Sequence, residues 1–404
     1  MEAPEGPVGA DFPFKQWLVS SQSPEVEALL KRAAERDDVI SFAGGLPADD
    51  LFPTEVMRAT LEQVMAEHGR EALQYHWAEG YEPLRAQILA MMRARGVEAR
   101  DDELLITNGA QQALDLVARL FLRTGDPLGI ESPTYVAAID VLRLQRPRMC
   151  PVERRTDGLD MDGLRRVLTE DRPNLVYLCP AGHNPTGGAL EGAARRELVE
   201  LATRHDSIFI EDDAYGRIQY EGAHPPLRSE AGSQQRVLHV GSFSKVLTPG
   251  LRVGWLIAPR VLIEQLLLLK GAADLQTGSL SQIVLSTYLE HHDLDAHLER
   301  CLRHYRDRRD ATLAALEREL SGALRWWRPR SGFSVWVELP DERPAEQVLR
   351  AAVDHGVAFE PGAPCFPCAP AERPQHHLRL CFSNLSPERI DEGIRRLAAA
   401  VQDG

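Results

Sequence analysis

Short apolar runs alternate with stretches of helical periodicity through the middle of the chain, from about residue 100 to residue 290. The apolar runs predict buried strands, and the periodic stretches between them predict amphipathic helices. The strands are expected at residues 103–107, 175–179, 208–212, 237–240 and 253–258, and the clearest helices at residues 110–122 and 189–204. This alternation is typical of an α/β fold in which helices flank a mostly parallel central sheet.

The pattern changes after about residue 290. A long, charged helical stretch at 293–320 precedes two short apolar runs, at 333–339 and 378–382, and a last helical stretch at 387–401. This mixture predicts a smaller α+β domain. The first 40 residues contain proline-rich segments and one amphipathic stretch, 24–36, and we expect them to form an arm.

The chain is therefore expected to have three parts. Residues 1–48 would form an N-terminal arm and part of the small domain, residues 49–292 the large domain, and residues 293–404 the C-terminal small domain. A chain of 404 residues is long enough to support more than one hydrophobic core.

Composition narrows the class of protein. The formal net charge of -14 argues against a nucleic-acid surface, which would present a basic face. The longest apolar run, residues 261–269, is shorter than the roughly 20 residues that span a bilayer, and the acidic N-terminus does not resemble a signal peptide. We expect a cytoplasmic protein with no nucleic-acid or membrane partner.

The six cysteines are scattered along the chain, which is not the density of a disulfide-stapled secreted domain. Cys365 and Cys368 form a Cys-x-x-Cys string that could indicate a zinc or redox site. No second cysteine pair accompanies them, so we favour a structural role and expect no bound metal.

The composition is unusual in having very few lysines. The chain has only four, at positions 15, 31, 245 and 270, and the other 42 of its 46 basic residues are arginine. Since arginine serves wherever a plain positive charge suffices, a lysine kept in a Gly/Ser-rich loop is a candidate for nucleophilic amine chemistry. Lys245 lies in such a loop.

Polar residues that follow the expected strands are the next candidates, because ligands of an open α/β sheet bind beyond the carboxyl ends of its strands. After the first strand, Gly109 allows close approach of the backbone, and the helix that begins there offers the free amides of Ala110 and Gln111. This turn predicts a phosphate cradle, with an ordinary strand-to-helix turn as the alternative.

Two further strands also end in polar clusters. Residues 183–188 form an Asn/Pro/Thr/Gly turn, whose composition is common in ordinary turns as well. Glu211, Asp212 and Asp213 put three carboxylates at one strand end, where they would repel one another without a cation or a proton nearby. A metal ion would suit them, but no matching second cluster of His, Asp or Glu is evident.

The loop that joins the last two expected strands gathers hydroxyls, an amine and a guanidinium, from Ser242, Ser244, Lys245 and Arg252. Hydroxyls and a guanidinium suit a phosphate. The chain contains no P-loop string, no Gly-x-Gly-x-x-Gly turn and no Gly-x-Ser-x-Gly elbow, so the common nucleotide and hydrolase motifs do not account for this loop.

Taken in order, these motifs resemble those of a fold-type I, pyridoxal-phosphate-dependent aminotransferase of class I/II. The motifs are Asn-Pro-Thr-Gly at 184–187, Asp-Asp-Ala-Tyr at 212–215, Ser-Phe-Ser-Lys at 242–245, and Arg252. Strings at 41–47, 73–75, 131–135 and 332–333 resemble the 2-aminoadipate aminotransferase-like branch, which is shared with the catalytic halves of MocR-type regulators. The resemblance extends over most of the chain and implies pyridoxal 5'-phosphate (PLP) as the cofactor.

The resemblance also implies catalytic roles. Lys245 would hold the cofactor as a Schiff base and later move a proton, and Asp212 would pair with the pyridine nitrogen. Asn184 and Tyr215 would hydrogen-bond the ring's phenolic oxygen, and Tyr135 would stack on the ring face.

The remaining cofactor contacts concern the phosphate. The Gly109 turn with the amides of Ala110 and Gln111 would hold it, together with the side chains of Ser242, Ser244 and Arg252. Tyr75 would reach it from a neighbouring subunit, so the resemblance implies a homodimer with shared active sites.

Substrate contacts follow from the same resemblance. Arg379 matches the family's arginine that clamps the substrate α-carboxylate, and Asn184 and Gly45 are expected beside it. The chain departs from the branch at Glu27, where a cation is often found, and at Glu360, where an apolar residue is usual. If both acids face the pocket, they would favour a cationic substrate side chain, and the alternative is that both are solvated.

The reaction implied is transamination between an amino acid and a 2-oxo acid. The same cofactor supports elimination, replacement and carbon–carbon bond formation, so a lyase or synthase of specialised metabolism, acting for example on a sulfonium-bearing amino acid, stays an alternative. A MocR-like regulator would need an N-terminal DNA-binding domain; the motifs begin at Ser41, and we expect no such domain.

Overall fold

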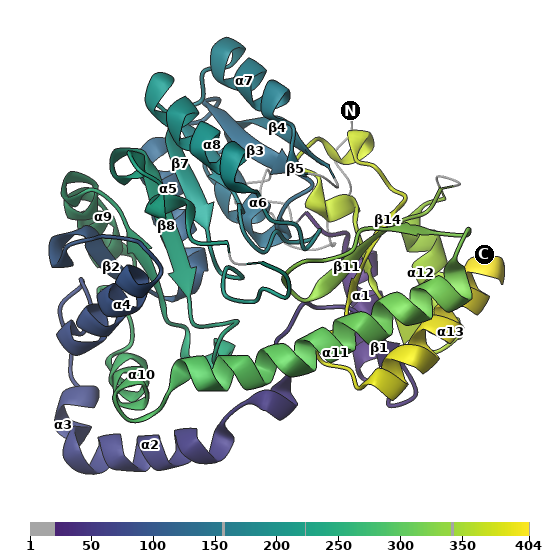
Figure 1. Cartoon of the computed structure of the whole chain (residues 1–404), viewed down its shortest axis with the longest axis horizontal. Helices are drawn as coiled ribbons and strands as arrows, with labels where there is room; N and C mark the ends of the chain where they lie inside the picture. Colours follow the sequence, from purple (N-terminus) through teal and green to yellow (C-terminus); the bar gives the residue numbers. More distant parts are fainter. Residues whose placement is uncertain (1–20, 156–157, 223, 341–342, 404) are drawn as a thin grey trace, which may run out of the picture.

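A large mixed sheet forms the centre of the computed structural model, which describes residues 21–155, 158–222, 224–340 and 343–403 (Figure 1). Its strand order is β2-β9-β8-β7-β6-β3-β4-β5. The strands are β2 (Leu104–Thr107), β3 (Pro127–Ser132), β4 (Arg148–Arg155), β5 (Gly158–Leu159), β6 (Leu175–Leu178), β7 (Ile208–Asp212), β8 (Val237–Ser242) and β9 (Gly254–Ile257). Neighbours from β8 through β4 run parallel, whereas β9 is antiparallel to both β8 and β2. The expected mostly parallel α/β sheet is confirmed.

Helices cover both faces of this sheet. One layer consists of α5 (Gly109–Phe121), α6 (Val136–Arg143) and α9 (Arg260–Ala273), and the other face carries α7 (Met161–Glu170) and α8 (Gly192–Arg204). The side chains of β6 alternate between these layers: Leu175 and Tyr177 pack with α5, and Val176 and Leu178 pack with α8. Because both faces of the sheet are buried, the sequences of the central strands are unbroken apolar runs and do not alternate with polar residues.

A second group of helices lies beyond the β2 and β9 end of the sheet (Figure 1). It contains α2 (Thr54–Glu67), α3 (Gly69–Ala72), α4 (Glu82–Ala94) and α10 (Ser279–His291). The apolar run at 261–269 belongs to α9, and no helix in the described part of the chain is both long and apolar enough to cross a membrane.

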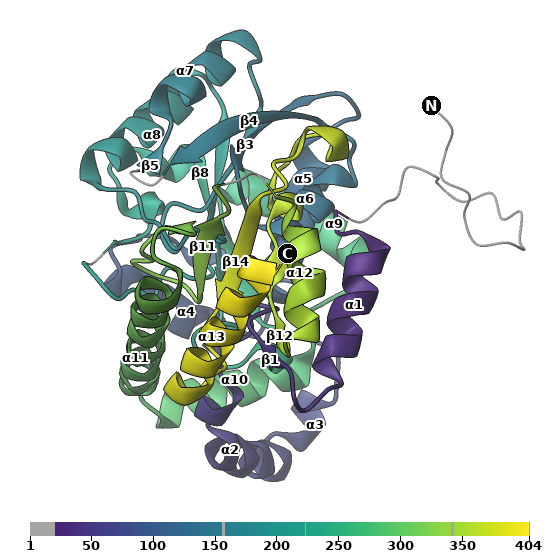
Figure 2. The ribbon, with the colours of Figure 1, turned by 90° about the vertical axis from the view of Figure 1, so that its right-hand side faces the viewer.

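The smaller part of the molecule is a four-stranded antiparallel sheet of order β10-β11-β14-β13. Its strands are β10 (Arg325–Trp326), β11 (Ser334–Glu338), β13 (Glu360–Pro361) and β14 (His377–Cys381). Three helices accompany it: α11 (Leu294–Leu320), α12 (Ala345–Asp354) and α13 (Pro387–Asp403). Figures 1 and 2 both show α11 beside α13, the longest pair of helices in this part.

The N-terminal segment joins this smaller part. Strand β1 (Ile40–Ser41) pairs in parallel with β12 (Val357–Ala358), which lies more than 300 residues further along the chain. Before it, α1 (Pro24–Ala34) begins at Ser23, whose Oγ accepts a hydrogen bond from the amide of Val26 at 3.2 Å. Residues 1–20 of the expected arm lie outside the described residues.

Candidate active site

A cavity of about 140 Å³ lies where β6, β7 and β8 end and α5 begins. The sequence-predicted residues that line it are Ala110, Gln111, Tyr135, Asn184, Asp212, Tyr215, Ser242, Ser244, Lys245 and Arg252. Strand β9, antiparallel to its neighbours, returns the chain so that Arg252 joins residues from the parallel strands. The fold therefore brings together side chains that are scattered over more than 140 residues of sequence.

Lys245 is half-buried and lines this cavity. Its Nζ donates a hydrogen bond to the backbone oxygen of Gly45 at 3.1 Å and lies 5.3 Å from the centroid of the Tyr215 ring. Burial lowers the pKa of the Lys245 amine from its ordinary value. A lowered pKa increases the share of unprotonated amine near neutral pH, which is the form that attacks a carbonyl.

Asp212 is the last residue of β7, and its carboxylate is buried. Oδ2 accepts a hydrogen bond from the hydroxyl of Tyr177 at 2.8 Å, and Oδ1 accepts one from the amide of Ala214 at 3.1 Å. Burial outweighs these bonds and raises the pKa of Asp212. A protonated nitrogen placed against this carboxylate would offset the burial.

Hydrogen-bond donors suited to a phosphate gather at the end of β8 and the start of α5. Ser242 Oγ lies 3.0 Å from Ser244 Oγ, and Arg252 Nη1 lies 3.4 Å from the same Ser244 atom. Arg252 Nη2 donates to the backbone oxygen of Asn108 at 3.4 Å, directly before α5. The first amides of α5 have no partner within their helix, so hydroxyls, a guanidinium and free N–H groups meet here.

Gly109 makes this approach possible. A Cβ atom on Gly109 would lie 2.6 Å from Arg252 Nη2, and the φ angle of Gly109 is +72°, in the left-handed region. Any larger residue would enter the space between the helix start and the guanidinium. These donors line one cavity with the buried carboxylate of Asp212 and the half-buried amine of Lys245, a set that fits PLP.

Arg379 and Glu360 form an ion pair beside the cavity. Arg379 Nη1 also donates to Asn184 Oδ1 at 3.0 Å, and a Cβ on Gly45 would lie 3.3 Å from Arg379 Nη2. The three predicted carboxylate-binding residues, Arg379, Asn184 and Gly45, therefore lie together. Glu360 faces Arg379, so the structure pairs this acid with an internal cation, an arrangement that neither of the two alternatives for it anticipated.

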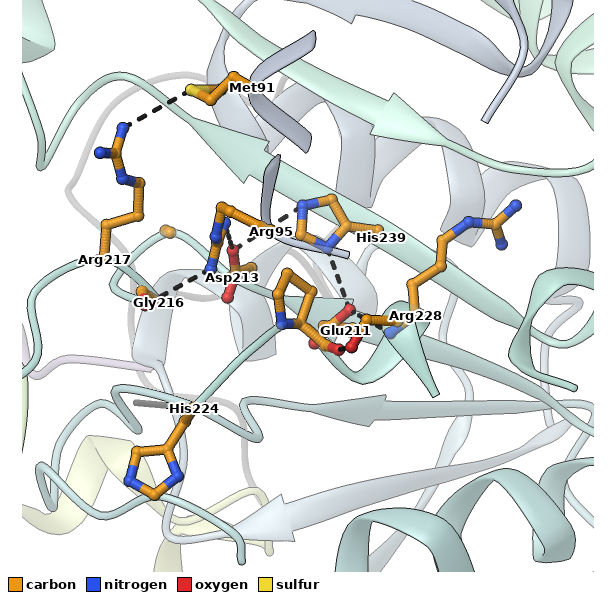
Figure 3. Close-up of polar contacts among 12 residues, drawn as sticks. Met91, Arg95, Glu211, Asp213, Gly216, Arg217, His224, Arg228 and His239 are labelled. Atoms are coloured by element: carbon orange, nitrogen blue, oxygen red, sulfur yellow. Dashed lines mark hydrogen bonds and ion pairs between the residues drawn. The ribbon is translucent and has the colours of Figure 1, made fainter. Parts of the chain in front are cut away.

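The three adjacent acids find three different environments. Because side chains alternate along a strand, Asp212 faces the cavity, whereas Glu211 and Asp213 lie on the opposite face of β7. There, His239 lies between them, with Nδ1 3.0 Å from Glu211 and Nε2 3.8 Å from Asp213, and Arg95 pairs with Asp213 at 2.5 Å (Figure 3). Within the described residues no group of three or more His, Cys, Asp or Glu is arranged to hold a metal ion.

Two predicted site residues lie away from the cavity of the single chain. Glu27 is on α1, where it pairs with Lys31 at 2.8 Å and keeps a half-exposed side chain. Tyr75 lies between α3 and α4 and is 75% exposed. The structure does not bring Glu27 to the substrate residues, and the role of Tyr75 stays a prediction about a partner subunit.

Sequence reasoning missed the supports behind the cavity. The sequence pattern places Tyr177 in an apolar strand and gives it no other role, although a tyrosine among aliphatic residues of a buried strand needs a hydrogen-bond partner. Glu131 is fully buried between Arg154, at 2.8 Å, and the amide of Cys179, at 2.6 Å. His183 packs beside it, and burial followed by the charge of Arg154 holds the pKa of His183 well below its ordinary value.

The Cys-x-x-Cys string has a structural environment. All six cysteines are free, and Cys365 is buried against Trp336 and Phe366. The backbone oxygen of Cys365 accepts a hydrogen bond from the amide of Thr134 at 2.8 Å, which links the smaller sheet to the residues before α6.

A fold-type I sheet with a half-buried lysine, a buried aspartate and a cluster of hydroxyl, guanidinium and amide donors at its carboxyl edge is the arrangement expected of a PLP-dependent enzyme. The chain belongs to the aminotransferase class I and II family, whose model matches residues 37–397. It is therefore a PLP-dependent aminotransferase, as the sequence resemblance implied.

Individual relatives agree with this assignment. The chain is 41% identical to a 2-aminoadipate transaminase of Thermus thermophilus over 94% of each chain, and 35% identical to aromatic-amino-acid aminotransferase 1 of Thermococcus litoralis over 96% of this chain and 94% of that one. A crystal structure of the α-aminoadipate aminotransferase of Thermus thermophilus, complexed with N-(5'-phosphopyridoxyl)-L-leucine, superposes with a TM-score of 0.88 at 39% identity, covering 96% of this chain and 97% of that one. These similarities favour an aminotransferase over the lyase or synthase alternative.

Proposed function

We propose that Lys245 bonds covalently to the aldehyde of PLP and then moves the proton in the exchange of an amino group between an amino acid and a 2-oxo acid. The observation that carries this proposal is that the Lys245 amine lines one cavity with Asp212 and with the donors proposed to hold the phosphate. Bound PLP supplies an electron-withdrawing ring that stabilises negative charge at the substrate Cα. Lys245, when its amine is not bonded to the cofactor, would take the proton from the substrate Cα.

Asp212 is proposed to pair with the ring nitrogen and keep it protonated. The hydroxyl of Tyr177 and the amide of Ala214 both donate to this carboxylate, which holds it in one orientation. A fixed, buried carboxylate favours a cation strongly because little water competes for it. Tyr177 would therefore act through Asp212 as a positioning residue.

Asn184, Tyr215 and Tyr135 are proposed to hold the cofactor ring. Burial raises the pKa of the Tyr215 hydroxyl, so that Tyr215 stays protonated and can donate a hydrogen bond to the phenolic oxygen beside Asn184. Tyr135, the residue before α6, lines the same cavity, which supports its expected position on the ring face.

The phosphate would be held by the amides at the start of α5 and by the side chains of Ser242, Ser244 and Arg252. This assignment is supported by the convergence of these donors and by the left-handed backbone of Arg252, whose φ is 54°. A non-glycine residue in that conformation costs free energy and persists only where its surroundings require it.

A homodimer is proposed, in which Tyr75 of each subunit reaches the phosphate of the other. Large apolar side chains are exposed around Tyr75: Leu73 is 70%, Trp77 is 81% and Leu275 is 62% exposed. Exposed groups of this kind mark protein interfaces. We further propose that the enzyme acts in the cytoplasm, which the six free cysteines support because reducing compartments keep thiols unpaired.

The test of the covalent role is reductive labelling. Holoenzyme treated with borohydride should carry the pyridoxyl mass on the peptide that contains Lys245, and Lys245→Arg, which keeps the charge but not the nucleophile, should carry none. Lys270→Arg is the matched control, since Lys270 is the other lysine of the large sheet region, is buried, and is paired with Asp274 at 2.9 Å outside the cavity lining. Pyridoxyl mass on another peptide of the wild type would refute the assignment.

A further inference from the structure

Glu360 and Arg379 face each other across the smaller sheet. In the antiparallel pair β13–β14, residue 360 lies directly opposite residue 379, so both side chains project from the same face of the sheet. The Glu360 carboxylate pairs with Nη2 of Arg379, and the amide of Gly44 donates to the same carboxylate oxygen at 3.4 Å. Strand register, and not a flexible loop, therefore sets this ion pair.

The pair changes the charge that a substrate meets. Arg379 is buried, with 6% of its surface exposed, and the Glu360 side chain keeps 20%. Burial by itself would lower the pKa of Arg379, but the charge of Glu360, followed by smaller contributions from Cys365, Cys381 and Tyr215, raises that pKa above its ordinary value. Arg379 therefore stays cationic, and its charge is already balanced before any substrate carboxylate arrives.

Arrival of the α-carboxylate leaves one negative charge in excess. Arg379 would then face two carboxylates, that of the substrate and that of Glu360, in a site with little water to screen them. A second carboxylate on the substrate side chain would add to the repulsion, whereas an ammonium group would relieve it. Lys245 and Tyr215 also face this site, and neither supplies a fixed positive charge once the lysine amine is bonded or neutral.

We propose that Glu360 is a specificity-determining residue that excludes amino acids with a side-chain carboxylate and favours those with a neutral or cationic side chain. This inference rests on the proposed role of Arg379 as the residue that binds the α-carboxylate. Glu27, the other acid that the sequence singled out, lies on α1 paired with Lys31 and does not share the position.

Glu360→Gln separates the effect of the negative charge from the effect of the side chain's shape. A glutamine side chain has the same length, and its amide oxygen can still accept from Gly44 and Arg379. Glu360→Asp keeps the charge and shortens the side chain. Glu338→Gln is the matched control, because Glu338 ends β11 in the same sheet and lies 3.7 Å from Arg325, outside the cavity lining.

The experiment compares the first half-reaction of the holoenzymes with three amino acids of similar length. L-2-aminoadipate ends in a carboxylate, L-norleucine in a methyl group and L-ornithine in an ammonium group, and the conversion of the bound cofactor is followed by stopped-flow absorbance. In Glu360→Gln the preference for 2-aminoadipate over norleucine should rise about tenfold, and the preference for ornithine should fall by a similar factor. Glu360→Asp and Glu338→Gln should keep the wild-type ranking.

Equilibrium binding separates this inference from the proposed function. Calorimetric titration with adipate and hexanoate, which carry two carboxylates and one, requires no chemistry. Adipate should bind to Glu360→Gln about tenfold more tightly relative to hexanoate than it does to the wild type. If no amino acid gives a half-reaction, the proposed function fails and the binding ratio still decides the role of Glu360. An unchanged binding ratio in Glu360→Gln overturns the inference.

Discussion

Alternation along a single strand gives adjacent residues different tasks. Asp212 points into the cavity, whereas Glu211 and Asp213 point to the opposite face of β7, where His239 and Arg95 balance them (Figure 3). The repulsion expected among three consecutive acids is therefore reduced, because no two neighbours share a face. Only Asp212 of the three lines the cavity, where we propose that it meets the cofactor.

Tyr177 should matter to the reaction although it bears no reactive group. Tyr177→Phe removes the hydroxyl that donates to Asp212 Oδ2 and leaves that buried oxygen short of a partner. Such a loss costs about 1–3 kcal/mol, so the half-reaction rate should fall roughly tenfold or more. Stopped-flow absorbance measures it. Tyr305→Phe is the control, since Tyr305 is equally buried and its hydroxyl bonds the amide of Ala48 at 3.1 Å; equal rates in the two variants would contradict the role of Tyr177.

Arg154 should matter mainly to stability. Arg154→Met leaves the carboxylate of Glu131 buried without its cation, which is expected to lower the free energy of unfolding by about 3–5 kcal/mol. Thermal unfolding of the holoenzyme measures the change. Arg155→Met, one residue along β4 with a side chain that is 55% exposed, should leave the melting temperature nearly unchanged. A similar shift in both variants would show that the buried pair is not the cause.

The ends of strands and helices position the residues that line the cavity. The junction of β2 and α5 places a glycine where Arg252 approaches, and the junction of β8 with the following loop places Ser242, Ser244 and Lys245. Both junctions are short: β2 ends at Thr107 and α5 begins at Gly109, and Ser244 and Lys245 follow the end of β8 at Ser242. A short junction leaves the backbone few conformations, so the strand end sets where these residues lie. The proposed phosphate cradle would thus depend on the ends of several elements and not on any one side chain.

Gly109→Ala tests this junction. The added Cβ would lie 2.6 Å from Arg252 Nη2, so the cradle must open and the dissociation constant for PLP should rise at least about tenfold. Fluorescence titration of the apoenzyme with PLP measures it. Gly125→Ala is the matched control: its φ of +87° imposes the same backbone strain, but a Cβ there meets nothing within 4 Å. Comparable losses of affinity would assign the effect to strain alone.

The prediction of elements succeeded where periodicity was strong. The strand at 208–212 and the helix ending at residue 204 lie at the expected positions, and the long charged helix is α11. No expectation was formed for α10, whose buried residues surround most of the helix and leave no polar face to reveal its period. The antiparallel direction of β9 could not be predicted either, because an apolar run is compatible with a strand of either direction.

At the scale of the molecule, the cavity is completed by residues distant in sequence. Lys245 bonds the backbone of Gly45, which is 200 residues away, and Arg379 bonds Asn184, 195 residues away. The pairing of β1 with β12 carries the N-terminal segment to this position. The division of the chain at residues 49 and 293 stays a prediction, and it is compatible with this long-range pairing.

Mixing two variants tests the proposed dimer. Tyr75→Phe should weaken phosphate binding in the partner's site, and Lys245→Ala should abolish activity in its own. If the sites are shared, a hybrid dimer contains one intact site, and at limiting PLP the mixture should recover about a quarter of wild-type activity. The recovery is measured as the aminotransferase activity of the two variants after they are mixed and refolded together. Analytical ultracentrifugation of the same mixture establishes the oligomeric state. No recovery above the separate variants would place Tyr75 outside the partner's site.

The sequence by itself determined the family of this protein. Lysine scarcity, strand-end clusters and motif order indicated the family and made Lys245, Asp212 and Arg252 candidates, because local chemistry and strand periodicity are written in short stretches of sequence. Only the tertiary structure decided which groups face one another. The pairing of Glu360 with Arg379 and the support of Asp212 by Tyr177 depend on strand register and sheet order, which arise from long-range packing that no single stretch encodes.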